Sequence, residues 1–342
     1  RSLSTNVNGQ NRNNNGTRTD GATNINIWLP HHNVYISPAE TIDTVNVSTN
    51  NFDAEQGMAG GAAVTVITKS GTNQFKGSAF EFYNSDKFNA SPYFFGNDPN
   101  GKPDKLPVTR NVYGGTVGGP IQRNRLFFFG SFEGYRQNLR FFNNRNVPSA
   151  ALRAGDFSNA RNANGSLQLI YDPLTGNPDG TGRTPFPNNI IPANRISSIA
   201  AKLNTYYPLP NSGGTGAGNL TNNFLREEQR TTDRDNYDVK INFNRTPTHQ
   251  IWGKFSHMRA FVDDLTYYLG PELPSNSDGG STKVYLGTFG QTWTLSPTLV
   301  WDTTVGFSRQ PHESFGADYF QGNIGLDVLG TPGTNDQGRG DE

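Results

Sequence analysis

The strict alternation of residues 237–244 restricts the fold of this chain more than any other feature of its sequence. Apolar side chains occupy every second position from Tyr237 to Phe243, and the positions between them are polar or charged. Successive side chains of a strand point to opposite faces, so the pattern predicts a strand with one apolar and one polar face. If such a strand crosses a bilayer, Lys240 must face the interior, because a charge at the lipid midplane costs about 2–4 kcal/mol.

Segments of the same character recur along the chain and predict seven strands. They span residues 75–83, 111–119, 126–137, 237–244, 250–259, 285–295 and 299–308. The connections between them are alternately short and long, which is typical of a membrane barrel and not of a sandwich. Trp252 breaks the alternation of its segment, and we expect it to be an interfacial anchor.

The composition fits short aromatic strands joined by polar loops. Only 33% of the 342 residues are hydrophobic and the mean hydropathy is −0.66, yet the chain has 23 Phe and 13 Tyr. Its 29 basic and 29 acidic residues balance, so nothing indicates nucleic-acid binding. Cysteine is absent, which excludes disulfides, thiolate metal sites and cysteine nucleophiles. No apolar run is long enough for a membrane-spanning helix.

A glycine-rich segment precedes the first of these strands. Residues 42–47 and 64–67 are rich in Val, Ile and Thr and predict two strands. The acidic and glycine residues between them are Asp53, Glu55, Gly57, Gly60 and Gly61. Because glycine allows positive φ and close approach of two backbones, residues 37–77 predict a strand, a turn-rich loop and a second strand.

This segment resembles the end of the plug domain of TonB-dependent outer-membrane receptors, in particular the Oar-like subgroup. The residues that carry this plug signature are Glu55, Gly57, Gly60, Gly61, Thr68, Lys69 and Gly71. They stand in an ordered series that runs from Glu55-Gln56-Gly57 to Asn73. A second match to the same subgroup follows at Gly114-Gly115, Gly118-Gly119-Pro120 and Phe127-Phe128-Phe129-Gly130.

The resemblance implies an all-β protein. Residues 1–73 would be the C-terminal part of a plug, and residues 74–342 the N-terminal part of a transmembrane antiparallel β-barrel with long extracellular loops. Such barrels have about 22 strands, so we expect the chain to be a fragment whose barrel is incomplete and whose outermost strand edges are unpaired.

The same resemblance implies a function in transport. It predicts TonB-dependent active uptake of a bulky extracellular substrate, a glycan, a peptide or a chelate, across the outer membrane of a Gram-negative bacterium. The implied partners are outer-membrane lipid, the substrate, and TonB with its inner-membrane motor. The segment that contacts TonB would lie outside this chain.

Residues 1–36 are rich in Asn and Thr and have two interpretations. On composition they form a flexible polar loop. By the resemblance, Asp20-Gly21 matches the Asp-Gly pair that precedes the apical loop of the plug, and the residues that follow would face the ligand. The predicted ligand-binding residues are Trp28, His31, His32 and Tyr35. Adjacent side chains diverge on an extended chain, so the two histidines do not indicate a metal site.

Residues 138–233 contain no comparable pair of strands, and we expect a long extracellular insertion there. Residues 149–154 predict one helical turn that Gly155 ends. Apolar residues at helical spacing predict a second helix from Ile196 to Leu203, before Pro208 stops it.

No catalytic pattern is present. The five histidines are scattered, and no Gly-x-Ser-x-Gly, Walker or His-Glu-x-x-His motif occurs. We therefore expect no enzymatic activity, no cofactor and no metal. Two alternatives to uptake remain open, a passive or structural outer-membrane barrel and a surface all-β adhesin that binds carbohydrate. A passive barrel has no reason to contain a plug, and the outward faces of an adhesin should be polar rather than carry Trp293, Trp301 and Phe307.

Overall fold

The structure is a computed structural model of the chain and describes residues 6–52, 56–57, 59–91, 105–265, 279–315 and 324–332. The chain divides into two compact units. The first comprises residues 1–138, 231–262 and 280–314, and the second residues 139–230, 263–279 and 315–342. No helix of the described residues is long and apolar enough to span a membrane.

The first unit contains a small sheet of four strands in the order β2, β1, β4, β3. Its strands are β1 (Gly16–Thr19), β2 (Ala22–Thr23), β3 (Ile42–Ser48) and β4 (Ala63–Thr68). Strand β4 pairs antiparallel with β3 and parallel with β1. This arrangement confirms the predicted strand, loop and strand of residues 37–77. Asp20 and Gly21 both have positive φ and form the tight turn between β1 and β2, as expected for an Asp-Gly hairpin.

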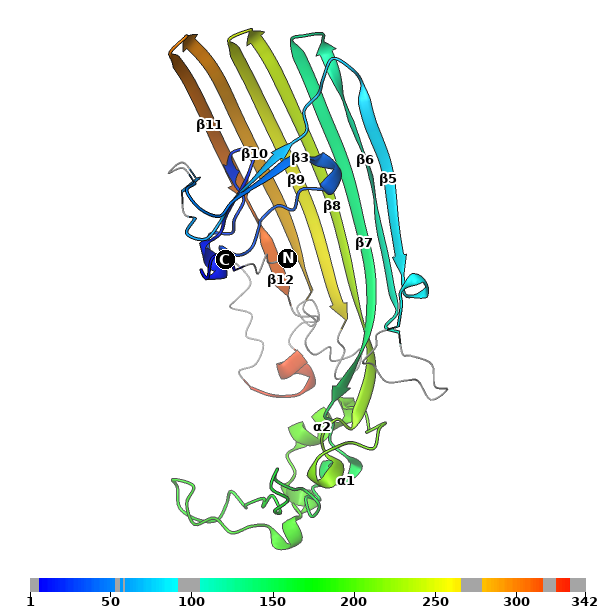
Figure 1. Cartoon of the computed structure of the whole chain (residues 1–342). Coiled ribbons are helices and arrows are strands. Elements are labelled where there is room, and N and C mark those ends of the chain that lie inside the picture. The colour runs from blue at the N-terminus through cyan, green and yellow to red at the C-terminus, as the bar shows by residue number, and fades with distance from the viewer. Residues whose placement is uncertain are drawn as a thin grey trace. The chain divides into compact units, whose positions relative to one another are not determined.

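The large sheet of the first unit is an antiparallel meander in the order β11, β10, β9, β8, β7, β6, β5. Its strands are β5 (Lys76–Ser85), β6 (Val108–Gln122), β7 (Leu126–Arg145), β8 (Phe224–Thr246), β9 (His249–Leu265), β10 (Gly279–Ser296) and β11 (Leu299–Arg309), and β12 (His312–Phe315) pairs with β10. The seven predicted strands are therefore confirmed. Figure 1 shows the short turns of three hairpins at one end of these strands.

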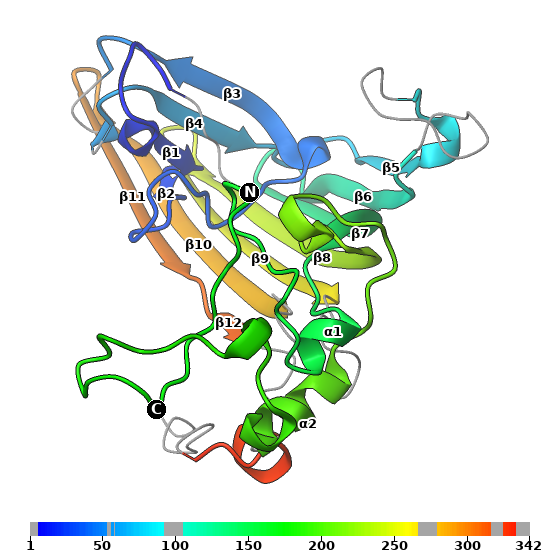
Figure 2. The same ribbon diagram turned by 90° about the horizontal axis from the view of Figure 1, so that it is seen from below.

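The sheet does not close into a barrel. Strands β5 and β11 lie at its two ends and have one sheet neighbour each among the residues described. Figure 2 shows the small sheet lying against one face of the large sheet. We call this face of the large sheet the inner face and the opposite one the outer face.

The outer face is apolar and aromatic. Its exposed side chains on β8 to β11 include Val239, Ile241, Phe255, Phe289, Val305 and Phe307. A row of rings crosses five strands, from Tyr113 through Phe132, Tyr237 and His257 to Tyr285, with centroid distances from 4.7 to 6.2 Å. Nearer the short turns, Trp293 lies between His249 and Trp301. Two aromatic rows that bound an apolar band are typical of a lipid-facing barrel surface.

The inner face is mainly polar. Lys240 lies there, buried and pointing away from the apolar band, as its place in the alternation requires. Trp252 also lies there, because its ring stacks under the Lys240 ammonium at 5.4 Å. The predicted role of Trp252 as an interfacial anchor is therefore wrong. Gly290 on β10 leaves the space for this ring, since a Cβ at Gly290 would lie 2.4 Å from Trp252 Cε2.

The second unit is more ordered than its sequence indicated. Strand β7 continues to Arg145 and β8 begins at Phe224, so the expected absence of paired strands over 138–233 is wrong at both ends. Glu228 is buried, and its carboxylate accepts a 2.9 Å hydrogen bond from the Arg145 guanidinium, with which it forms an ion pair. In these extensions apolar residues point to both faces, as the adjacent pairs Phe141 and Phe142 on β7 and Phe224 and Leu225 on β8 do, and charged residues lie among them. The apolar residues therefore have no period of two that would reveal the strands.

The predicted helices of the second unit are confirmed as α1 (Ala150–Arg153) and α2 (Ser198–Tyr206). Ser149 caps α1 and Gly155 follows it with φ of 86°. The remaining short helices of the chain are η1 (Arg12–Asn14), η2 (Ala39–Thr41), η4 (Asp86–Phe88), η5 (Pro187–Asn189), η6 (Ala193–Arg195), η7 (Ala217–Asn219) and η8 (Ile324–Val328). Buried Asn189 joins Phe157, Gln168 and Ile170 through side-chain hydrogen bonds.

Candidate functional site: a buried polar cluster between the two sheets

Four buried charged side chains join the small sheet to the inner face of the large sheet. The carboxylate of Asp20 lies 3.0 Å from Lys240 Nζ and 3.2 Å from Lys254 Nζ. Lys254 also lies 3.5 Å from the carboxylate of Asp238. With two carboxylates and two ammonium groups, the cluster is neutral. Each of these charges is costly to bury alone, so the four are stable only as a set.

The position of Asp20 follows from local sequence. The Asp-Gly turn between β1 and β2 presents its carboxylate to the large sheet, and Thr68 at the end of β4 fixes it with bonds of 3.1 Å from the backbone N–H and 2.6 Å from Oγ1. Burial raises the pKa of Asp20, but Lys254, Lys240 and Thr68 together outweigh it and hold the pKa below its usual value of 3.8. The carboxylate is therefore ionised at neutral pH.

Tyr35 supplies the second contact of the small sheet. Its hydroxyl donates a 2.6 Å hydrogen bond to Asp238 Oδ2, while Ser256 donates a 2.6 Å bond to the other oxygen. Buried Asn24 holds the Tyr35 backbone through bonds of 2.8 and 2.9 Å. Burial, and then the charge of Asp238, raise the pKa of Tyr35 well above its ordinary value. The phenol therefore stays protonated and acts as a donor.

The cluster residues that belong to the large sheet lie on two neighbouring strands, and the alternation of side chains along each strand brings them to the inner face. Asp238 and Lys240 are two residues apart on β8, and Lys254 and Ser256 are two apart on β9, so all four point to the inner face. Beside them, an apolar cluster of Ala22, Val34, Tyr35, Met258, Val284 and Leu286 completes the contact. The two sheets are thus joined by a small apolar core and a larger polar network.

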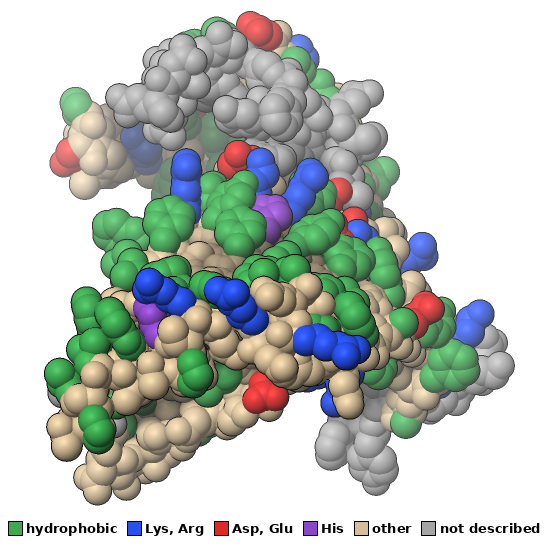
Figure 3. Space-filling model, turned by 90° about the horizontal axis from the view of Figure 1, so that it is seen from above, with side chains coloured by type: hydrophobic (Ala, Val, Ile, Leu, Met, Phe, Trp, Pro, Cys, Tyr) green, Lys and Arg blue, Asp and Glu red, His purple; other side chains and the backbone are tan. Residues whose placement is uncertain are grey.

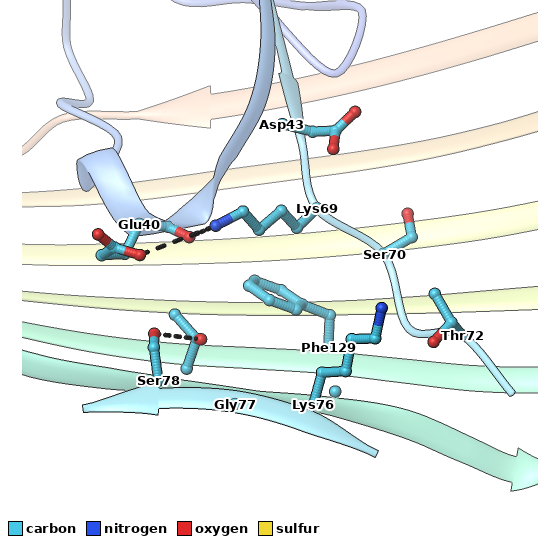
Figure 4. Close-up of a pocket in the computed structure, with 11 residues that line it drawn as sticks. Glu40, Asp43, Lys69, Ser70, Thr72, Lys76, Gly77, Ser78 and Phe129 are labelled. Atoms are coloured by element: carbon cyan, nitrogen blue, oxygen red, sulfur yellow. Dashed lines mark hydrogen bonds and ion pairs between the residues drawn. The ribbon is translucent and has the colours of Figure 1, made fainter. Parts of the chain in front are cut away.

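A pocket of about 270 Å³ lies between the segment that follows β4 and strands β5, β6 and β7. Figure 4 shows Lys69 reaching across it to Glu40, with Lys76 and Ser78 of β5 on the facing wall. Lys69 Nζ donates to the Glu40 backbone oxygen at 2.7 Å and lies 3.8 Å from its carboxylate. The pocket thus carries charges of both signs.

The residues of the predicted plug signature have structural roles in the small sheet. Gly60 and Gly61 donate backbone bonds of 2.7 and 2.9 Å to Asn14. Gly71 crosses the hairpin of β6 and β7, where a Cβ would lie 2.2 Å from the Phe128 oxygen, so only glycine fits. Gly57 has positive φ, and Thr68 and Lys69 make the contacts given above. Glu55 lies outside the described residues.

The predicted ligand-binding residues do not form one exposed group. Trp28 is 90% exposed, at a turn in which its backbone N–H and that of Leu29 donate to Asn26 Oδ1. Tyr35 is only 1% exposed, so the prediction that it faces outward is wrong. The ring of Tyr35 is large and apolar, and its hydroxyl donates a hydrogen bond to a buried carboxylate. A tyrosine is usually buried where its hydroxyl has such a partner.

His31 and His32 lie close together, contrary to the divergence expected of an extended chain. Their ring centroids are 4.3 Å apart because a turn brings His32 N–H to the Leu29 oxygen at 2.8 Å. Burial and the charge of His31 lower the pKa of His32. His31 Nδ1 lies 2.8 Å from Asn13 Oδ1. Within the described part of the chain, no group of three His, Asp, Glu or Cys side chains could hold a metal ion.

These features define an open antiparallel sheet of the membrane β-barrel type, with a smaller sheet bound to its inner face. Sequence comparison assigns its family. The profile of the family described as "Outer membrane beta barrel domain" matches residues 67–341, so the chain belongs to this family and is an outer-membrane protein. It is also similar to the TonB-dependent transporter Oar of Myxococcus xanthus, with 28% identity over 135 residues, 37% of this chain. The chain spans only 12% of the length of that transporter.

Comparison with solved structures finds two receptors that are similar to this chain. The siderophore receptor PirA of Acinetobacter baumannii is 14% identical, with a TM-score of 0.36 over 89% of this chain and 41% of the receptor. The siderophore receptor PiuA of the same organism is 10% identical, with a TM-score of 0.35 over 91% of this chain and 40% of the receptor. Similarity at this level says nothing about the substrate of the present protein.

Proposed function

We propose that the chain is part of a TonB-dependent receptor that imports a bulky extracellular substrate. In this proposal, residues 1–73 are the C-terminal part of a plug and residues 74–342 are the first part of the barrel that surrounds it. The observation that carries the proposal is the buried ionic cluster of Asp20, Asp238, Lys240 and Lys254, which ties the small sheet to the inner face. A passive pore has no use for such an attachment.

The chemistry of this attachment suits a plug that moves. Charged and hydroxyl groups lose less free energy than apolar groups when a contact opens to water, because water replaces their partners. The polar network therefore holds the plug in register at rest and lets it separate when TonB pulls. TonB and its inner-membrane motor are the proposed partners, and they would act on a segment outside this chain.

We propose Trp28, His31 and His32 as residues that contact the substrate. Trp28 is exposed on a defined turn, and its indole can stack on a sugar or a peptide group while the neighbouring imidazoles supply hydrogen bonds. Tyr35 belongs to the contact between the sheets and holds the end of the same loop. The type of substrate, glycan, peptide or chelate, is left to experiment.

Depletion of growth medium tests the proposal without a known substrate. The compounds removed from a complex medium are compared by mass spectrometry for wild-type cells, cells that lack this gene, and cells that lack TonB. We expect at least one class of compound to remain in the medium of both deletion strains. In cells whose protein carries Trp28→Ala and is otherwise intact, the same class of compound should remain in the medium.

The same experiment distinguishes the alternatives. If the compounds missing from wild-type medium are also depleted without TonB, the barrel is passive and active uptake is wrong. If no compound depends on the gene, but cells without it lose binding to immobilised glycans, the adhesin interpretation holds instead.

A further inference from the structure

An extended segment of the second unit, residues 166–172, has one of its two backbone edges paired. The backbone groups on this edge belong to the even-numbered residues and make hydrogen bonds of 2.7–3.0 Å. Their partners are the backbones of Ala160, Asn162, Thr184 and Phe186 and the side-chain amide of buried Asn189. The segment therefore lies against its unit as an edge strand lies against a sheet.

The other backbone edge of the segment is open. In the β-bridges of Arg161 with Leu167 and of Tyr171 with Pro185, the hydrogen bonds come from the residues on either side. The N–H and C=O groups of Leu167 and Tyr171 therefore point away from the paired edge, and those of Leu169 between them point the same way. None of the backbone groups of these three residues has a partner among the described residues.

The side chains of the open edge are apolar or aromatic. Leu167, Leu169 and Tyr171 lie two residues apart and share one face, and they are 39%, 45% and 48% exposed. Hydrophobic side chains are exposed on the first unit as well, where they gather in a band (Figure 3), but the aromatic rows of that band are typical of a surface that faces lipid.

Two charged residues flank this row, and both are bonded within the second unit. Arg161, opposite Leu167, donates to the backbone oxygens of Ser158 and Ala160 at 2.8 and 3.1 Å. The carboxylate of Asp172 accepts bonds of 2.6 and 3.1 Å from Arg195. The open edge is thus an uncharged strip with unpaired backbone groups.

An open, apolar edge is a template to which another strand can pair. Residues 167–171 span about 17 Å when extended, which is the length of a five-residue peptide. A stable interface between two proteins uses about 20–30 residues on each side, so this short edge suits a peptide better than a second copy of the chain. Pro173 follows the segment and limits the edge at that end.

We propose that the open edge of residues 167–171 binds an extended, uncharged peptide by adding it as a strand. The main chain of the peptide would pair with Leu167, Leu169 and Tyr171, and its alternate side chains would pack on theirs. This inference rests on the proposed function, in which the second unit is an extracellular insertion, and it names the substrate class as peptide. A glycan does not present main-chain amides at the repeat of a strand.

A binding experiment with a defined peptide tests the inference. The intact protein is purified in mild detergent, immobilised and titrated with acetyl-Ser-Val-Thr-Leu-Thr-Val-Ser-amide. Two further forms of this peptide are N-methylated, one at every odd and one at every even residue, so that each has one blocked edge. We expect the unmodified peptide to bind, and one of the methylated forms to bind at least about 10-fold more weakly, since several hydrogen bonds are lost together.

A proline variant tests the same edge from the side of the protein. Leu169→Pro removes an N–H that has no partner among the described residues, so it should block the added strand, weaken peptide binding at least about 10-fold and leave the fold intact. The control is Ala163→Pro, at the second position of the turn that Gly165 N–H closes on the Asn162 oxygen at 2.8 Å. Proline is favoured at that position, and this variant should bind the peptide as the wild type does.

Four outcomes would overturn the inference. They are no binding of the unmodified peptide, equal binding by wild type and Leu169→Pro, equal binding of all three peptides, and a wild-type dimer that Leu169→Pro converts to a monomer. The last would show that the edge pairs with a second copy of the chain.

The test is independent of TonB, so it separates this inference from the proposed uptake. If the medium experiment finds TonB-dependent depletion of a glycan and the peptide does not bind, uptake stands and the peptide site is wrong. If the peptide binds at the edge while depletion does not need TonB, the site stands and active uptake is wrong.

Discussion

The hydroxyl of Tyr35 donates a 2.6 Å hydrogen bond to Asp238 across a sequence separation of 203 residues. Both side chains are buried, and the bond joins the loop after β2 to the inner face of β8. The Asp238 carboxylate also accepts a hydrogen bond from the Ser256 hydroxyl and forms an ion pair with Lys254. This carboxylate therefore connects two strands of the large sheet, β8 and β9, to the loop after β2. The predictions below concern the network around it.

Replacement of Tyr35 by Phe should destabilise the contact between the sheets. The change keeps the ring but leaves one oxygen of a buried carboxylate with a weaker set of donors, which costs about 1–3 kcal/mol. Unfolding of the intact protein by denaturant in detergent measures the loss. Tyr237→Phe, on the outer face, is the matched control and should have little effect. Equal stability of both variants would show that the bond to Asp238 contributes nothing.

Asp20→Asn should lower the stability of the folded protein more than Tyr35→Phe does, because it leaves the two buried ammonium groups of Lys240 and Lys254 with one carboxylate. Breaking a buried ion pair on one side costs about 3–5 kcal/mol. The double variant Asp20→Asn with Lys240→Met should recover part of this loss, since the uncompensated charge is removed with its partner. Asp43→Asn, at an exposed site of the same sheet, is the control. Additive losses in the double variant would mean that Asp20 and Lys240 are not coupled.

The cluster also predicts a dependence of stability on pH. The folded pKa of Asp20 lies below its ordinary value of 3.8, so its stabilisation is complete above that pH and is lost as the pH falls through the folded pKa. Melting temperatures of the wild type should therefore fall more steeply below this pH than those of Asp20→Asn. Parallel curves for the two proteins would contradict the assignment.

Gly290 and Gly287 form a matched pair on β10. A Cβ at Gly290 would lie 2.4 Å from the Trp252 ring, whereas a Cβ at Gly287 meets nothing within 4 Å. Gly290→Ala should therefore displace Trp252 from beneath Lys240 and cost about 1–3 kcal/mol. Gly287→Ala should be neutral or slightly stabilising. Trp fluorescence and denaturant unfolding of the two variants test this difference.

A disulfide between the sheets tests whether they must separate during uptake. A Cβ built at Gly21 lies 3.5 Å from Thr304 Cβ, within the range of a disulfide, and the chain has no cysteine of its own. Gly21→Cys with Thr304→Cys should block depletion of the medium until a reductant is added. The positive φ of Gly21 strains the cysteine in both redox states, so the comparison with and without reductant isolates the effect of the bond. The control pair Gly60→Cys and Asn14→Cys, 3.6 Å apart within the small sheet, should leave uptake intact. Uptake through the first pair when oxidised would exclude separation at this contact.

The amino-acid sequence determined the strands of this protein and the face to which each side chain points. The two-residue period of residues 237–244 was sufficient to predict that Lys240 faces inward, and the glycines near Gly71 indicated a close approach of two backbones. Alternation is a local property of the chain, so it can be seen without knowledge of the fold. The same reasoning missed the ends of β7 and β8, because apolar and charged residues are mixed on both of their faces.

Only the tertiary structure decided which charges meet. Asp20, Asp238, Lys240 and Lys254 each appear in the sequence as ordinary polar residues, and Tyr35 as an exposed ring of a loop. Their burial depends on two sheets packing face to face, so a position along the chain cannot reveal it. The position of Lys283 on β10 directly opposite Arg259 on β9 likewise depends on strand register. The sequence of either strand alone does not set that register.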